Sequence, residues 1–273
     1  MNTDENENTN ENANESERTA GERRTVALIT GGNRGLGRAT ALALAEAGTD
    51  VILTYRSGKD EAASVVDAVS ALGRTAVAVE LDTTRFDTFP AFAASIRDAL
   101  RTTWDRDSFD FLVNNAGAAA PSPAGETQVE AFDLMIDVHF KGVFFLTQTL
   151  LPLIADGGRV VNLSTGLTRF VSEGLSVYAA AKGAVEIWTK YLAMELGPRG
   201  ISVNVVAPGP IATDFFGGMV RDNQEMRAAL SSQTALGRVG ESEDIGGVIA
   251  SLLSPGTGWI TAQRVEASGG TRL

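Results

Sequence analysis

The feature that most constrains the fold is a short apolar segment followed at once by a glycine-rich turn and an alanine-rich helix. Thr25-Val-Ala-Leu-Ile-Thr30 has the nearly continuous apolar character of a strand buried in a parallel sheet. The turn that follows contains Gly31, Gly35 and Gly37, and glycines let backbone amides approach a phosphate closely. Residues 38–47 are typical of a helix whose N-terminus faces that phosphate. Strand, turn and helix in this order predict a phosphate-binding βαβ unit.

The same alternation of apolar strands and helices continues toward the C-terminus. Right-handed crossovers between such strands produce a doubly wound parallel sheet. The sequence therefore predicts an α/β, Rossmann-type doubly wound parallel seven-stranded sheet, in a single domain of residues 25–273. Further strands are expected at 51–55, 75–80, 109–113, 159–163, 201–206 and 264–267, with helices at 60–72, 86–101, 129–154 and 176–196.

Residues 1–24 differ from the rest because they are rich in Asn, Glu and Thr and nearly free of large apolar side chains. A segment of this kind cannot offset its ordering entropy, so a disordered acidic N-terminal tail is expected. It has neither the apolar core nor the initial basic cluster of a secretory signal. No later run of membrane-spanning length lacks a polar interruption.

Charge and cysteine content narrow the functional classes. The net charge of −11 disfavours non-specific nucleic-acid binding, and the absence of cysteine excludes disulfides and thiolate metal sites. These features fit a cytoplasmic protein with no nucleic-acid, membrane or metal partner.

A second informative segment is Ser176-Val-Tyr-Ala-Ala-Ala-Lys182. Tyr178 and Lys182 are four residues apart on a predicted helix, so their side chains share one face. A free tyrosine has a pKa of about 10, and a fixed positive charge nearby favours the phenolate. Such a pair can donate and accept a proton near neutrality. The alternative is an ordinary pair on a solvated helix face.

Four motifs in register resemble the short-chain dehydrogenase/reductase family, and the match extends from about Thr25 to the C-terminus. They are Thr30-Gly31-x3-Gly35-x-Gly37, Asn114-Asn115-Ala116-Gly117, Tyr178-x3-Lys182 and Pro208-Gly209. The resemblance implies reversible, NAD(P)H-dependent reduction of a ketone or aldehyde to an alcohol. In that reaction Tyr178 is the general acid or base, and Lys182 lowers the phenol pKa and binds the nicotinamide ribose.

Two family positions carry unusual residues in this chain. A serine 13 residues before the tyrosine is replaced by Thr165. We assign it the substrate-oxygen role because neighbouring side chains on a strand point opposite ways, which directs Ser164 elsewhere. An asparagine that holds a relay water is replaced by His139. The imidazole is interpreted either as a pH-sensitive link in proton delivery or as a neutral, hydrogen-bonded core residue.

The end of the second strand indicates the cofactor. An NAD site usually has an acid there, whereas this chain has Arg56 and Ser57, with no acid before Asp60. Arg34 in the glycine turn is expected beside the same group, and two arginines favour a 2′-phosphate. NADP(H) is therefore the expected cofactor, with NAD(H) as a second one, unless both arginines are plain surface residues.

The remaining cofactor contacts are implied by the resemblance. Asp82 has the alternative role of a helix N-cap, and the segment Asn114–Gly117 has the alternative of a plain turn. The full implied set is Gly31, Asn33, Arg34, Gly35, Leu36, Gly37, Arg56, Ser57, Asp82, Thr83, Asn115, Ala116, Gly117, Tyr178, Lys182, Pro208, Gly209, Ile211 and Thr213.

Substrate and assembly are the least constrained by sequence. Thr168, Phe170 and Phe215 are expected in the substrate wall, Arg169 is the only charged group near it, and 215–219 suits an apolar lid. The expected substrate is therefore a neutral, fairly hydrophobic carbonyl compound. Helices 129–154 and 176–196 are apolar on more than one face, so a homotetramer is expected, and a dimer next. The alternative function is a regulatory protein that binds NADP(H) without turnover, because Thr165 and His139 depart from the family pattern.

Overall fold

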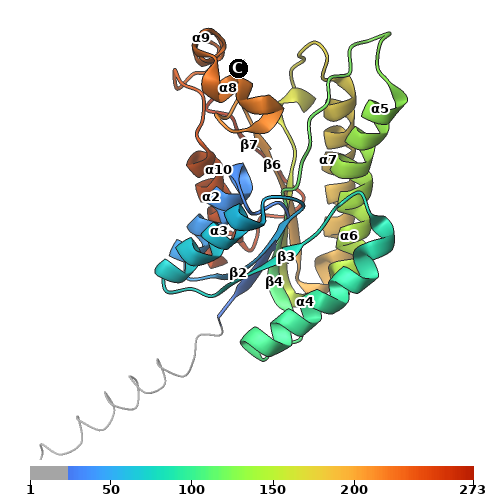
Figure 1. Ribbon diagram of the computed structural model, residues 1–273, viewed down its shortest axis with the longest axis vertical. Coiled ribbons are helices and arrows are strands. Elements are labelled where there is room, and N and C mark those ends of the chain that lie inside the picture. The colour runs from blue at the N-terminus through green and yellow to red at the C-terminus, as the bar shows by residue number, and fades with distance from the viewer. Residues whose placement is uncertain (1–23) are drawn as a thin grey trace, which may run out of the picture.

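The computed structural model describes residues 24–273, which form one all-parallel sheet between two layers of helices (Figure 1). The strand order is β3-β2-β1-β4-β5-β6-β7, so the chain reverses its direction of winding between β1 and β4. The predicted doubly wound, seven-stranded sheet is confirmed, and the predicted tail lies outside the described residues except for Arg24. The strands are β1 (Val26–Ile29), β2 (Asp50–Tyr55), β3 (Ala76–Glu80), β4 (Phe109–Asn114), β5 (Ile154–Leu163), β6 (Ser202–Pro208) and β7 (Arg264–Ala267).

Three helices cover each face of the sheet. α2 (Gly35–Glu46), α3 (Lys59–Ala71) and α10 (Ser242–Leu253) pack on one face. α4 (Phe89–Trp104), α6 (Gly142–Leu150) and α7 (Ser176–Leu196) pack on the other. α8 (Met219–Asp222) and α9 (Gln224–Ser232) stand beyond the sheet, at the top of Figure 1.

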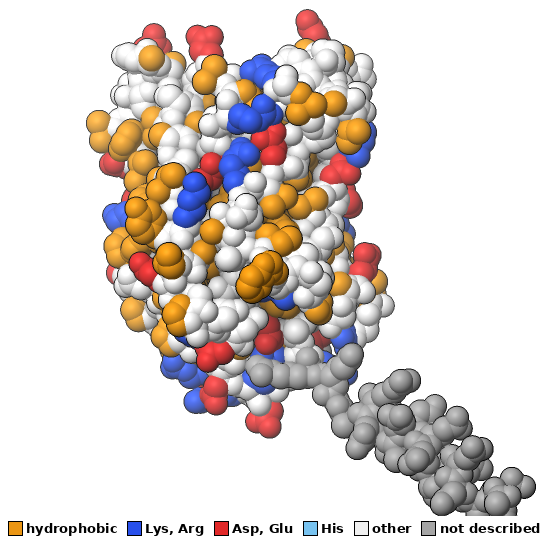
Figure 2. Space-filling view, turned by 180° about the vertical axis from the view of Figure 1, so that it is seen from behind, with side chains coloured by type: hydrophobic (Ala, Val, Ile, Leu, Met, Phe, Trp, Pro, Cys, Tyr) orange, Lys and Arg blue, Asp and Glu red, His pale blue; other side chains and the backbone are white. Residues whose placement is uncertain are grey.

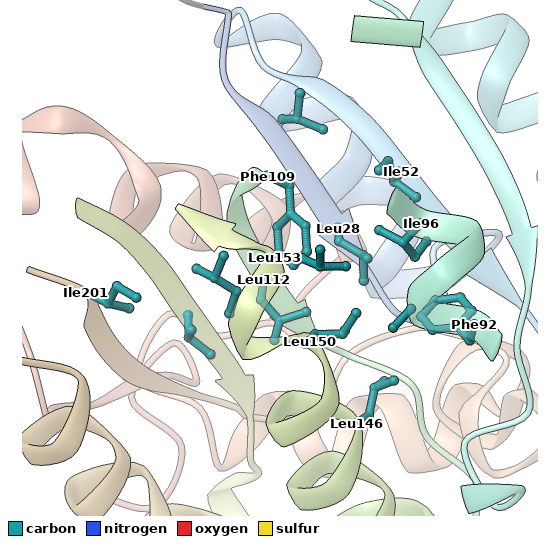
Figure 3. Packing of buried hydrophobic residues seen from close by; sticks show 14 of the residues in the cluster. Leu28, Ile52, Phe92, Ile96, Phe109, Leu112, Leu146, Leu150, Leu153 and Ile201 are labelled. Atoms are coloured by element: carbon teal, nitrogen blue, oxygen red, sulfur yellow. The ribbon is translucent and has the colours of Figure 1, made fainter. Parts of the chain in front are cut away.

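The core consists of two apolar layers because successive strand residues point to opposite faces. In β1, Val26 and Leu28 belong to the layer under α4, α6 and α7, whereas Ala27 and Ile29 belong to the layer under α2, α3 and α10. Burial on both faces explains why the strands are apolar runs without alternation. Figure 3 shows the first layer, in which strand residues Leu28, Ile52 and Leu112 meet helix residues Phe92, Ile96, Leu146 and Leu150.

β5 begins five residues before the start predicted from the sequence. Gly157 and Gly158 in its first half suggest a turn, but the strand passes through them with a register irregularity opposite β4. Gly157 has a φ of +76°, which a glycine adopts without strain. The sequence prediction also contains no counterpart of α8, α9 and α10.

The helix predicted for 129–154 ends at Leu153 and is interrupted. α5 (Val129–Ile136) passes into a π-helical turn, Asp137–Lys141, before α6 begins. A Cβ on Gly142 would lie 2.4 Å from the carbonyl oxygen of Thr83, so only glycine allows this close approach. π-helical turns are frequent at functional sites, and this one carries His139.

The same stretch, Val129–Leu153, is long and apolar enough by composition to cross a membrane, and it is the one such helix among residues 24–273. The sequence prediction assigned no segment of that kind. Met135 and Leu146 on this helix are buried in the fold, as in the core helix of a globular domain. This packing accounts for part of its hydropathy, since 44% of its most apolar window is buried.

Candidate active site

The glycine turn after β1 lies where the winding of the sheet reverses. Gly31 and Gly35 have φ values of +64° and +52°, a region that favours glycine. A Cβ on Gly37 would lie 2.2 Å from the carbonyl oxygen of Gly31, so the first turn of α2 packs directly on the loop. α2 has no side-chain cap and no acid in its first turn. Its first amides therefore face the crevice unsatisfied and suit an anionic group.

Thr30 and Asn115 hold this turn against β4. The Asn115 Nδ2 atom donates to the carbonyl oxygens of Thr30 (2.9 Å) and Gly31 (3.0 Å). The Thr30 hydroxyl oxygen accepts from the amides of Asn115 and Ala116, both at 2.9 Å. The Asn115 side chain thus shapes the cradle and is directed toward the turn.

A buried polar chain crosses the sheet beside this cradle. Asn114 Nδ2 donates to Asn162 Oδ1 at 2.8 Å, and Asn162 Nδ2 donates to Thr189 Oγ1 at 2.9 Å. These bonds join the ends of β4 and β5 to α7, the helix that carries Tyr178 and Lys182. They fix the distance between that helix and the sheet.

Tyr178, Lys182 and Thr165 meet at the carboxyl end of β5. All three are buried, and the Thr165 side chain lies close enough to the Tyr178 phenol to influence its pKa. Lys182 Nζ donates to the carbonyl oxygen of Leu163 at 2.7 Å and lies 6.0 Å from the centre of the Tyr178 ring. Ser164 points away and donates to Glu186 Oε1 at 2.6 Å. Thr165 and Lys182 therefore both lie close to the Tyr178 side chain.

Burial dominates the protonation of this group. Burial raises the pKa of Tyr178 to about 12, and the Thr165 hydroxyl opposes that rise. Burial also lowers the pKa of Lys182 to about 7. Acidification of the phenol by Lys182 stays a prediction, because desolvation is the largest influence on both groups.

His139 lies edge-on to the Tyr178 ring, with ring centres 4.8 Å apart. Its Nε2 atom is 2.7 Å from the carbonyl oxygen of Ala118, and its buried Nδ1 atom has no partner. Burial and the charge of Lys182 lower the His139 pKa to about 3. A pH-sensitive link near pH 6.5 is therefore wrong. His139 is a neutral imidazole whose free Nδ1 acceptor is enclosed near the reacting groups.

Two phenylalanines cover Tyr178 from the segment 214–222, which we term the lid. Ring centres of Phe215 and Phe216 lie 5.8 and 6.2 Å from that of Tyr178. Phe216, Gly217 and Gly218 all have φ values between +52° and +79°. Arg221 forms ion pairs with Asp214 and Asp222 and so ties the two ends of the lid together.

The residues expected at the adenosine end lie on one rim. Arg34, Arg56 and Ser57 are exposed, and neither arginine has an ion-pair partner within residues 24–273. Asn33 Nδ2 donates to the carbonyl oxygen of Ser57 at 3.1 Å, which joins the glycine turn to the end of β2. Two free guanidinium groups beside uncapped helix amides fit a phosphorylated ribose.

Other predicted cofactor residues have structural contacts of their own. The Asp82 carboxylate accepts from the amide and hydroxyl of Thr84, so it caps a turn before α4. This role resembles the alternative of a helix N-cap that the sequence left open for Asp82. Ile211 forms a β-bridge to Gly240, and Thr213 lies against Gly35 across the crevice. Leu36 packs partly on the core, and Gly209 lies against the backbone of Ser268.

The predicted substrate wall is only partly adjacent to Tyr178. Phe215 contacts it, but the Thr168 hydroxyl bonds to Glu186 Oε1 at 2.8 Å and faces away. Arg169 pairs with Glu266 and stacks on Phe170, so it offers no free charge. Phe216 lies in the segment 215–219 that was expected to form an apolar lid, whereas sequence reasoning missed Glu186 and Arg264. The helical spacing of Tyr178, Lys182 and Glu186 was the available signal for Glu186.

No group of three or more His, Asp or Glu side chains within residues 24–273 could hold a metal ion. The fold and the site instead define a Rossmann-type oxidoreductase with a tyrosine–lysine pair. The comparisons identify its family. Residues 31–272 match the family model described as enoyl-(acyl carrier protein) reductase.

An uncharacterised oxidoreductase of Methylorubrum extorquens is 37% identical over 247 residues, which cover 90% of this chain and 97% of that protein. An Arabidopsis thaliana protein described as NADPH-dependent aldehyde reductase-like is 33% identical, over 90% of this chain and 93% of that protein. The crystal structure of the angucycline C-6 ketoreductase LanV with bound NADP is 36% identical, with a TM-score of 0.86 over 92% of this chain and 97% of that one. The chain belongs to the short-chain dehydrogenase/reductase family.

Proposed function

We propose that this protein is an NADP(H)-dependent reductase that converts a ketone or aldehyde to an alcohol, with Tyr178 as the proton donor. The observation that carries the proposal is the burial of Tyr178, Lys182 and Thr165 together at the carboxyl end of β5. NADPH-dependent aldehyde reductase and NADP-bound ketoreductase relatives support both the cofactor and the reaction class.

The bound cofactor would supply the hydride, and this chain's own residues handle the oxygen. A substrate oxygen placed between Thr165 and Tyr178 receives two hydroxyl hydrogen bonds, which stabilise the charge that develops on it. The raised pKa of Tyr178 keeps the phenol protonated, which is the form that reduction consumes. Lys182 would orient the ribose of a bound cofactor and help to return a proton to the Tyr178 phenolate. The enclosed Nδ1 atom of His139 would accept a hydrogen bond in that relay. The Phe215 and Phe216 rings exclude water and favour a neutral, apolar substrate.

The cofactor residues proposed from the sequence fit an anionic dinucleotide. Gly31, Gly35 and Gly37 form a cradle that side chains would fill, and Arg34 with Arg56 supplies positive charge at its rim. This combination favours NADP(H) over NAD(H). A homotetramer in the cytoplasm, with the folded domain at residues 25–273, completes the proposal.

The test is NADPH oxidation followed by absorbance with a panel of apolar ketones and aldehydes. Wild-type protein should turn over at least one member and prefer NADPH to NADH. Tyr178→Phe should lower kcat by about 100-fold or more, because general acid catalysis typically contributes 10²–10⁴-fold. NADPH binding to this variant, measured by fluorescence, should persist.

The control is Tyr191→Phe, which removes a phenol hydroxyl from the exposed side of the same helix. Its kcat should equal that of wild type. NADPH binding without turnover of any carbonyl compound would favour the regulatory alternative, and an active Tyr178→Phe would remove Tyr178 from the reaction.

A further inference from the structure

The loop that presents Thr165 is bonded to a carboxylate outside the reacting group. Glu186 lies on α7, four residues beyond Lys182. Its Oε1 atom accepts from Ser164 Oγ at 2.6 Å and from Thr168 Oγ1 at 2.8 Å. A single carboxylate oxygen therefore bonds to residues on both sides of Thr165.

Arg264 on β7 completes this enclosure. Its Nε atom donates to Glu186 Oε1 at 2.8 Å, and its Nη2 atom donates to the carbonyl oxygen of Thr165 at 3.2 Å. Its Nη1 atom donates to Glu266 Oε2 at 3.0 Å, which anchors the guanidinium from the other side. The side chains of Arg264 and Glu186 are only 24% and 16% exposed, so solvent screens this pair weakly.

The bonds from Glu186 and Arg264 act on the main chain and flanking residues of Thr165. The Thr165 hydroxyl oxygen accepts from the amide of Leu167 at 3.3 Å, which leaves the hydroxyl proton available for donation. β5 ends at Leu163, so Thr165 lies beyond the sheet hydrogen bonds and needs another support. A hydroxyl that stabilises a reacting oxygen must be held to within about 0.5 Å of its working position. A planar guanidinium with several fixed donors can bond the carboxylate and the carbonyl at once, which a lysine cannot do.

We propose that Arg264 and Glu186 are positioning residues for carbonyl reduction, because together they fix the Thr165 hydroxyl against Tyr178. The inference rests on the proposed function, since it assumes that Thr165 contacts the substrate oxygen. It assigns a kinetic role to a charged pair that connects β7 with the helix of Tyr178 and Lys182. Neither residue touches the substrate.

The experiment is a double-mutant cycle on kcat with the best substrate of the panel. Thr165→Ala should lower kcat by about 100-fold, as loss of a preorganised donor does. Arg264→Gln should lower kcat by about 10-fold with the KM for NADPH unchanged, because misplacement of the donor weakens only the transition-state contact. In the Thr165→Ala background Arg264→Gln should cost less than about 2-fold, since residues that act through one group are not additive.

Conservative changes refine the assignment. Arg264→Lys should recover only part of the loss, and Glu186→Gln should lower kcat in the same coupled manner. If Arg264→Gln fails to fold, the Glu186→Gln cycle with Thr165→Ala decides the question alone. A purely structural role would lower the melting temperature without any coupling to Thr165.

Arg199 provides the matched control. Its guanidinium likewise bonds a carboxylate, Asp156 Oδ1 at 2.7 Å, and main-chain carbonyl oxygens, including that of Leu151 at 3.0 Å. These residues lie at the opposite end of β5, so Arg199→Gln should leave kcat unchanged. If the two kcat losses multiply, to about 1000-fold in the double variant, the inference is overturned. The proposed function still stands in that case, provided that Tyr178→Phe is inactive. An active Tyr178→Phe would instead defeat the proposed function itself.

Discussion

At the scale of single residues, burial decides the charge states in the active site. Tyr178 and Lys182 are both removed from water, and each shifts toward its neutral form. A protonated phenol is ready to donate, whereas oxidation of an alcohol needs the phenolate. A protonated Tyr178 phenol can fill the role of proton donor that carbonyl reduction requires.

His139 gives a prediction at the same scale. Its pKa is about 3 in the folded chain against 6.5 in a free histidine. His139 therefore binds a proton below pH 6.5 in the unfolded chain, but only below about pH 3 in the folded chain. The free energy of unfolding falls as the pH falls from 6.5 toward 3. Between pH 6.5 and pH 5 the free energy of unfolding should drop by about 1.5 kcal/mol from this group.

The measurement is urea unfolding of wild type and His139→Asn at pH 6.5 and pH 5. His139 is the only histidine, so the two proteins share every other titrating group. The variant should lose less stability than wild type on acidification. Equal losses would mean that the imidazole is accessible to protons in the folded state.

At the scale of elements, the lid is the least ordinary segment. Three successive residues, Phe216, Gly217 and Gly218, take the left-handed conformation that places two aromatic rings on Tyr178. Gly217 has open space around its missing Cβ but a φ of +69°. Alanine there would fit sterically yet cost about 1 kcal/mol of backbone strain.

Gly217→Ala should therefore open the lid more often, by about fivefold, since 1.4 kcal/mol corresponds to a factor of ten. Hydrogen exchange of the lid amides measures this, with the amides of α7 as an internal reference. Gly247→Ala on α10 is the control, because that glycine also has open space but an ordinary φ. It should leave lid exchange unchanged, and an unchanged lid in Gly217→Ala would show that the left-handed turn does not hold it closed.

Some elements could be predicted from the sequence more accurately than others. β1, α7 and β7 were predicted well because apolar runs, a helical spacing and a glycine turn are local signals. α8, α9 and the left-handed conformation of the lid were not predicted, since these elements are short and have no buried apolar face to give a periodic signal. The π-helical turn at Asp137–Lys141 depends on the close approach of Gly142 to Thr83, a contact that no helical periodicity reveals.

Part of the candidate active site could likewise be predicted from the sequence, and part could not. The spacing of Tyr178 and Lys182 placed them together, and strand alternation separated Ser164 from Thr165 as the structure has them. Charge states could not be predicted, because desolvation depends on what covers a residue. Arg264 and Glu186 are 78 residues apart and meet only through the order of the strands.

At the scale of the whole molecule, the outer side of α5, α6 and α7 is unusually apolar. Ile187, Tyr191 and Met194 recur at helical spacing on α7 and are 56%, 66% and 80% exposed. Phe132 on α5 and Phe145 on α6 are exposed as well. Figure 2 shows hydrophobic side chains along the side of the molecule where these helices lie. A continuous apolar face of this kind favours association with a second copy.

We expect a tetramer in solution, measured by light scattering after gel filtration. A double variant with Tyr191→Glu and Met194→Lys should dissociate it, because it places charges at the centre of the apolar face. Leu72→Glu, at an exposed apolar position directly after α3, is the control and should leave the mass unchanged. A monomeric wild type would show that this face has another use.

α7 presents its reacting groups and its apolar face to opposite sides, and this has a consequence for how such chains can diverge. A helix rotates by about 100° per residue, so one inserted residue between Lys182 and Ile187 would turn the two sides out of alignment. Substitutions on either side leave the other in place, but insertions and deletions do not. Length variation among related chains should therefore collect at the ends of this helix, near Leu175 and Gly197, and avoid its middle.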